Sequence, residues 1–120
     1  MGFLYYNGVV EFEFEDRTLA HLKAAIGTKL RRQESFLLNW TNPPENGSGR
    51  VTLWISPAIP LVFKFAGNTP PTLNNAWVQV LIETANTPRG MTVVRENQLD
   101  AVVTNPMTGA VTRLPGTASP

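Results

Sequence analysis

The residues that most often perform chemistry are few and scattered in this sequence. The chain has one histidine, His21, and no cysteine, so a metal centre built on several histidines or on thiolates is excluded. Because His21 stands alone near Arg17 in a helical pattern, we interpret it as a residue at the boundary of that helix. The sequence therefore predicts no catalytic residue, no metal site and no cofactor.

Three carboxylates alternate with apolar residues near the start of the chain. Glu11, Glu13 and Glu15 would lie along one strand face, about 7 Å apart. Paired carboxylates can transfer protons or bind Ca²⁺ or Mg²⁺, but no aspartate cluster accompanies these three. We interpret them as the solvated face of a sheet.

A group of cations is a candidate nucleic-acid patch, helped by base stacking on Trp40 and Trp54. The group consists of Lys23, Lys29, Arg31, Arg32 and Arg50. The formal net charge of the 120-residue chain is only +1, whereas duplex-DNA binders usually carry a strong basic excess. Nucleic-acid binding is therefore the second hypothesis.

The segment 46–50 is rich in glycine and ends at Arg50. A phosphate-binding loop follows a strand and opens a helix, whereas this segment precedes a strand and lacks a Lys-Ser or Lys-Thr pair. We interpret it as a flexible connection.

Periodicity predicts the elements that must position these residues. Strands are expected at 3–6, 10–14, 36–40, 51–55, 61–65 and 91–95, and helices at 16–32 and 73–86. Asn7-Gly8 is a hairpin signal between the first two strands, and Asp16 is the expected N-cap of the first helix. In 53–65, Pro57 and Pro60 make a rigid corner between two short apolar runs.

These elements predict an α+β fold, a mainly antiparallel sheet with two helices on one face in the order ββαβββαβ. One sheet face would carry Phe12, Phe14, Phe36, Leu38, Val51, Leu53, Leu61 and Phe63 against Leu19, Leu22, Ile26, Trp77 and Leu81 of the helices. The opposite face would carry Tyr5, Trp54 and Lys64, which we interpret as a candidate protein interface.

The composition changes after residue 96, which divides the chain into a compact domain, 1–96, and a C-terminal extension, 97–120. The extension predicts a small hairpin that is too short to be stable alone, followed by a disordered end. We expect Val102, Val103 and Val111 of this hairpin to join the interface, by strand addition to an open edge next to residues 3–6 of another copy. We therefore expect the chain to form a homo-oligomer or to join a larger protein assembly.

Residues 12–94 resemble a small domain family of actinobacteria and their phages. The resemblance is collinear and covers Asp16-Arg17, Leu19-Ala20-His21-Leu22, Lys29-Leu30-Arg31-Arg32, Glu34-Ser35-Phe36, Gly47-Ser48-Gly49-Arg50, Trp54, residues 56–65, residues 70–74 and Ala76-Trp77. Members of that family are uncharacterised, and many carry the label "ATP-dependent DNA ligase". The resemblance implies a compact domain and no established activity.

The ligase label does not fit the lysines of this chain. A ligase of that class needs a lysine that takes AMP within a Lys-x-Asp-Gly motif. Lys23, Lys29 and Lys64 are followed by Ala-Ala-Ile, Leu-Arg-Arg and Phe-Ala-Gly, so none of them matches. The label is judged erroneous.

The leading functional hypothesis is a non-enzymatic structural or interaction protein that assembles into an oligomer, as a minor capsid, decoration or tail-associated protein of a phage particle. A charged fraction of 16% beside an apolar fraction of 42% fits a surface that is partly buried against a partner. No segment is apolar over the length needed to cross a bilayer, and the N-terminus does not have the pattern of a signal peptide. We expect a location in the cytoplasm or the virion.

Overall fold

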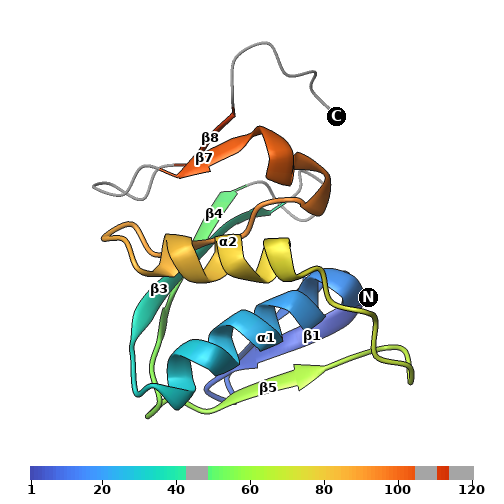
Figure 1. Ribbon diagram of the computed structural model, residues 1–120. Coiled ribbons are helices and arrows are strands. Elements are labelled where there is room, and N and C mark those ends of the chain that lie inside the picture. Colours follow the sequence, from blue (N-terminus) through green and yellow to red (C-terminus); the bar gives the residue numbers. More distant parts are fainter. Residues whose placement is uncertain (43–48, 105–110, 114–120) are drawn as a thin grey trace.

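The computed structural model describes residues 1–42, 49–104 and 111–113, and it has the predicted α+β fold. The elements follow the order ββαβββαβ before the C-terminal extension, as the sequence predicts (Figure 1). In chain order they are β1 (Gly2–Tyr6), β2 (Val10–Phe14), α1 (Asp16–Arg31), β3 (Phe36–Asn42), β4 (Gly49–Ile55), β5 (Leu61–Lys64), α2 (Asn75–Ala85), β6 (Met91–Thr92), η2 (Glu96–Ala101), β7 (Val102–Thr104) and β8 (Val111–Arg113).

The compact part contains two three-stranded sheets where the sequence predicts one. Their strand orders are β2-β1-β5 and β4-β3-β6, and β6 runs parallel to β3 while the other pairs are antiparallel. The chain changes sheets between β4 and β5, where Pro57 and Pro60 prevent a continuous ladder. The two sheets meet through Trp40, whose ring makes edge contacts at 5.0 Å with both Phe12 and Phe14.

The N-terminal hairpin forms at the predicted turn. Asn7 and Gly8 have positive φ angles of 55° and 67°, which these two residue types tolerate best. Glu11, Glu13 and Glu15 are exposed while Phe14 is buried, so the predicted solvated acidic face is confirmed.

The strand edge that was expected to accept a C-terminal extension is not open. β1 is the central strand of its sheet, paired with β2 on one side and with β5 on the other. Strand addition next to residues 3–6 is therefore wrong, because both backbone edges of β1 already have partners. In the two three-stranded sheets the edge strands are β2, β5, β4 and β6.

The hydrophobic core lies between the sheets and the helices, with the members that periodicity predicts. Figure 1 shows α1 and α2 side by side, with β1 and β5 next to α1. Of the predicted core residues, those of the helices are buried, and those of the strands are buried or packed partly buried against them.

His21 is completely buried, so its interpretation as a boundary residue is wrong. Its ring stacks on Trp77 of α2, with 4.3 Å between ring centroids and 30° between planes. Nδ1 lies 2.7 Å from the Arg17 carbonyl, and Nε2 accepts the backbone N–H of Asn74 at 2.8 Å. A carbonyl only accepts and a backbone N–H only donates, so these partners select the neutral tautomer with its proton on Nδ1.

The second helix is shorter than predicted because Asn74 caps it. The Asn74 side chain accepts from the backbone N–H groups of Ala76 and Trp77, at 3.0 and 3.3 Å. After the helix, Gly90 has a φ of 95°, and a Cβ there would lie 2.5 Å from the Leu37 carbonyl oxygen. The predicted strand 91–95 is reduced to two residues.

The extension begins on the compact part of the chain. Glu96 receives two bonds of 2.7 Å from the Arg17 guanidinium and one of 2.9 Å from the Asn74 side chain. Leu99 packs partly buried against the core. The predicted pairing of the two short strands is confirmed by β7 and β8. Residues 105–110 of their connection, residues 114–120 and residues 46–48 of the glycine-rich segment lie outside the described residues.

The Arg17–Glu96 pair predicts a specific loss of stability in acid. The bonds from Arg17 and then Asn74 lower the pKa of Glu96 from 4.5 to about 2. A lowered folded-state pKa contributes stability above pH 4.5, and that contribution is lost as the pH falls toward 2. The Glu96→Gln variant should therefore lose less stability than the wild type between pH 5 and pH 2, measured by urea unfolding. Glu13→Gln, which removes an exposed carboxylate of the sheet face, is the control and should follow the wild type.

The buried histidine predicts a second effect. His21→Phe preserves a ring against Trp77 but leaves the Asn74 N–H without an acceptor. The free energy of unfolding should fall by about 1 kcal/mol, the net contribution of a hydrogen bond to a half-buried amide. Hydrogen exchange at the Asn74 amide should accelerate as well. Unchanged stability would contradict the bridging role of His21.

Candidate functional site: the groove between α1 and β5

The candidate nucleic-acid residues do not form one patch. Lys29 is buried, and its ammonium group is 3.0 Å from Glu34 and bonded to the side chain of Asn86 at the end of α2. A cation suits the negative end of that helix dipole. Lys29 therefore joins α1 to α2 and is not a surface cation.

The other four cations lie on different surfaces. Lys23 and Arg31 line a groove beside α1, whereas exposed Arg32 follows the end of that helix. Arg50, at the start of β4, lines a second depression of about 1210 Å³. The cations of that depression are balanced by glutamates: it is lined by Arg17, Arg50, Arg89 and Arg95, and by Glu13, Glu15 and Glu96. It therefore offers no concentrated positive charge for an anion.

The candidate interface residues are also divided. Tyr5 and Lys64 lie on the outer face of the β2-β1-β5 sheet, where Val62 is 56% exposed. Trp54, which is 52% exposed, belongs to the other sheet. Val102, Val103 and Val111 are in β7 and β8, and their side chains lie outside the described part of the structure.

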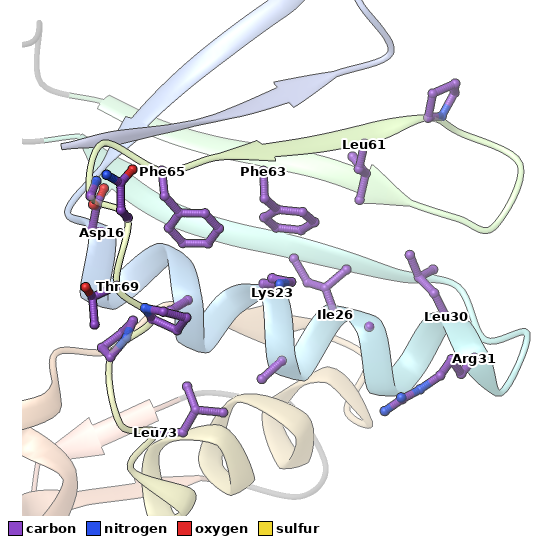
Figure 2. Close-up of a pocket in the computed structure, with 18 of the residues that line it drawn as sticks. Asp16, Lys23, Ile26, Leu30, Arg31, Leu61, Phe63, Phe65, Thr69 and Leu73 are labelled. Atoms are coloured by element: carbon purple, nitrogen blue, oxygen red, sulfur yellow. Dashed lines mark hydrogen bonds between the residues drawn. The ribbon is translucent and has the colours of Figure 1, made fainter.

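A long apolar groove lies between α1 and β5, with a volume of about 890 Å³. Figure 2 shows Leu61, Phe63 and Phe65 directed from the β5 segment toward α1. The opposite wall is a helix face of small residues, Ala20, Ala24 and Gly27. Because these side chains are short, the groove reaches close to the helix backbone.

Gly27 faces open space on the helix wall. A Cβ built there would meet no atom within 4 Å, so the fold itself does not require glycine at this position. The sequence indicates only that Gly27 weakens the helix slightly. A side chain at position 27 would occupy part of the groove.

The wall formed by residues 66–73 is held in place by the first turns of α1. The carboxylate of Asp16 accepts the backbone N–H of Ala66 at 3.1 Å and that of Gly67 at 2.8 Å. Arg17 donates to the Thr72 carbonyl at 3.0 Å.

The prediction that Asp16 caps the first helix is wrong. The cap position is Glu15, whose side chain makes no capping bond, and the Asp16 carboxylate bonds to the groove wall instead. The bonds from Gly67 and Ala66 lower the pKa of Asp16.

The backbone of β5 presents hydrogen-bonding groups to the groove side. Asn7 N–H donates to the carbonyl of Pro60 at 2.9 Å, so these opposite residues form a hydrogen-bonded pair. Such pairs alternate along an antiparallel ladder, so Val62 and Lys64 also bond to β1. The N–H and C=O groups of Leu61 and Phe63 must then point away from β1. Within the described residues, no strand pairs with that edge.

Two cations border the groove on its α1 side. The Lys23 ammonium lies 5.9 Å from the centroid of the Phe65 ring, and Arg31 lies two helical turns further along. Among the described residues, neither forms an ion pair. The carboxylate of Asp16, which also lines the groove, already accepts hydrogen bonds from the backbone N–H groups of Ala66 and Gly67.

The lining of the groove is mainly apolar. Its titratable side chains are Asp16, Lys23 and Arg31, and in the described residues no three metal-ligating side chains gather. The residues that form it were not recognised as a site from the sequence, because small and apolar side chains give the same pattern as a core. In the same part of the chain, neither helix has the length and apolarity to span a bilayer.

Comparison with known proteins places the chain in a family. No curated protein and no solved structure matches it. A family model described as "Domain of unknown function (DUF7882)" matches residues 1–96, which include both sheets, both helices and the whole groove. The chain therefore belongs to this uncharacterised domain family.

Proposed function

We propose that this chain is a non-enzymatic interaction protein that binds an extended segment of a partner protein in the groove between α1 and β5. The segment adds to β5 as a further strand, and its alternate side chains enter the groove. This mode of recognition takes affinity from main-chain hydrogen bonds and specificity from the side chains that point into the pocket.

The observation that carries the proposal is the coincidence of an open strand edge with an apolar groove. Leu61 and Phe63 direct backbone groups to the edge and side chains to the groove. A small apolar ligand would use the groove but leave the backbone groups to water. An extended protein segment satisfies both, which is the reason for preferring it.

Nucleic-acid binding receives less support. Of the five candidate cations, Lys29 is buried and Arg50 lies on a different surface beside three glutamates. The remaining charges are too few to neutralise many phosphates. The absence of a Lys-x-Asp-Gly motif also argues against nucleotidyl transfer.

The setting suggested by the resemblance, an actinobacterial phage and a place on its particle, stays a prediction. So does assembly through the C-terminal extension, although its expected acceptor edge is closed. The groove provides a different acceptor, open to a strand from another protein. The genes next to this one would test the setting, since capsid or tail genes there would support it.

The groove can be blocked without disturbing the fold. In Gly27→Phe the new ring should occupy the groove, because Gly27 lines it and a Cβ there would meet no atom within 4 Å. Peptides selected on the full-length chain from a displayed random library should bind this variant at least about tenfold less tightly, as expected for loss of a buried anchor. Wild-type binding should also slow hydrogen exchange at the Leu61 and Phe63 amides.

Gly27→Ala is the matched control for that experiment. A methyl group leaves the groove open and should stabilise the helix by about 0.5–1 kcal/mol. Peptide affinity should then remain close to that of the wild type. The proposal is wrong if no peptide is selected, or if the selected peptides bind Gly27→Phe as tightly as Gly27→Ala.

Assembly through the extension is tested separately. The full-length chain should be larger than a monomer in light scattering, and removal of residues 97–120 should shift its mass toward the monomer. The truncated chain should still unfold cooperatively, because both sheets and both helices precede residue 97. Equal masses of the two chains at equal concentration would contradict this role of the extension.

A further inference from the structure

The walls of the groove also specify what kind of segment it binds. Lys23, Gly27 and Arg31 are spaced four residues apart on α1, so they share one helix face. Gly27 lies midway and is open, and the two cations flank it. Along this face, the positive charge of Lys23 is followed by the apolar hollow over Gly27 and then by the positive charge of Arg31.

The spacing of this helix face matches the repeat of a strand. Lys23 and Arg31 are separated by about 12 Å along the helix axis, from eight residues at the helical rise. In a strand, side chains that share a face recur every second residue, and positions i and i+4 are about 13 Å apart. Figure 2 shows the β5 segment running along α1 from Leu61, beside Leu30, to Phe65, beside Lys23. A strand added to β5 would run along the same line.

Building on the function proposed above, we infer that the partner segment is an acidic strand with the pattern acidic–x–large apolar–x–acidic. The apolar side chain enters the hollow over Gly27, beside Ile26 and Phe63. The two carboxylates meet Lys23 and Arg31. The intervening residues point to the other face of the sheet, toward solvent, and carry no strict requirement.

Charge complementarity distinguishes this occupant from the chain's own extension. In residues 97–120 the only charged side chains are Asp100 and Arg113, so no pair of acids with the required spacing exists there. A second copy that docked its β5 edge in the groove would bring Lys64 and further positive charge. A foreign acidic segment is the occupant that fits the two cations.

The test compares two synthetic peptides on the full-length chain. The first has the sequence Thr-Glu-Thr-Leu-Thr-Glu-Thr, and the second replaces both glutamates by lysines. The wild type should bind the acidic peptide about tenfold more tightly, since two partly exposed ion pairs replace two repulsions. The preference should weaken with added salt, because the charges lie at the solvent-exposed border of the groove.

Charge reversal supplies the decisive comparison. Lys23→Glu/Arg31→Glu should reverse the preference, so that the lysine peptide binds more tightly. The control is Arg32→Glu/Arg50→Glu, which makes the same change in net charge at exposed positions outside the groove and away from β5. The control should keep the wild-type preference, because it leaves the groove unchanged.

The outcomes separate this inference from the proposed function. Equal binding of both peptides, with both lost in Gly27→Phe, would overturn the acidic pattern and leave the groove as a strand-binding site. A preference that reverses equally in the two charge variants would also overturn it, because only the net charge would then matter. Binding of neither peptide, together with a failed library selection, would overturn the proposed function itself.

Discussion

The contact on which most of the structure depends is the buried His21 ring between the two helices. It stacks on Trp77 and accepts the Asn74 N–H, so it sets where α2 begins and which side of α2 faces α1. Asn74 in turn caps α2 and donates to Glu96. One neutral imidazole thus connects α1 to the start of α2 and, through Asn74, to the start of the extension.

Residues in the first turns of α1 also hold the groove wall formed by residues 66–73. Asp16 holds the backbone at Ala66 and Gly67, Arg17 holds Thr72, and His21 holds Asn74. The connection from β5 to α2 is therefore bonded to one helix at both of its ends. A wall fixed in this way favours binding, because little conformational entropy remains to be lost when a partner enters.

The groove combines two features that folded proteins normally avoid exposing. One is an unpaired strand edge at β5, and the other is a strip of partly buried aromatic side chains beside it. Both become favourable when a strand is added, since backbone groups gain partners and apolar surface leaves water. The second depression differs in that arginines and glutamates line it together.

Sequence patterns determined the local structure of this protein, because periodicity and turn chemistry act between near neighbours. The Asn7-Gly8 turn, the alternation of Phe12 and Phe14 with glutamates, and the order of helices and strands all follow from residues close in the chain. The core was predictable for the same reason, because each amphipathic face must be buried.

Tertiary structure alone decided how these elements are shared among sheets and which polar groups are buried. Whether β5 pairs with β1 or with β4 depends on long-range register, which local patterns do not encode. Lys29 and His21 have the spacing of ordinary helix residues, and their bonds to Asn86 and Asn74 join positions more than fifty residues apart. The groove arises in the same way: small and apolar residues look like core in the sequence, and the packing of α1 beside an unpaired strand leaves them facing a space.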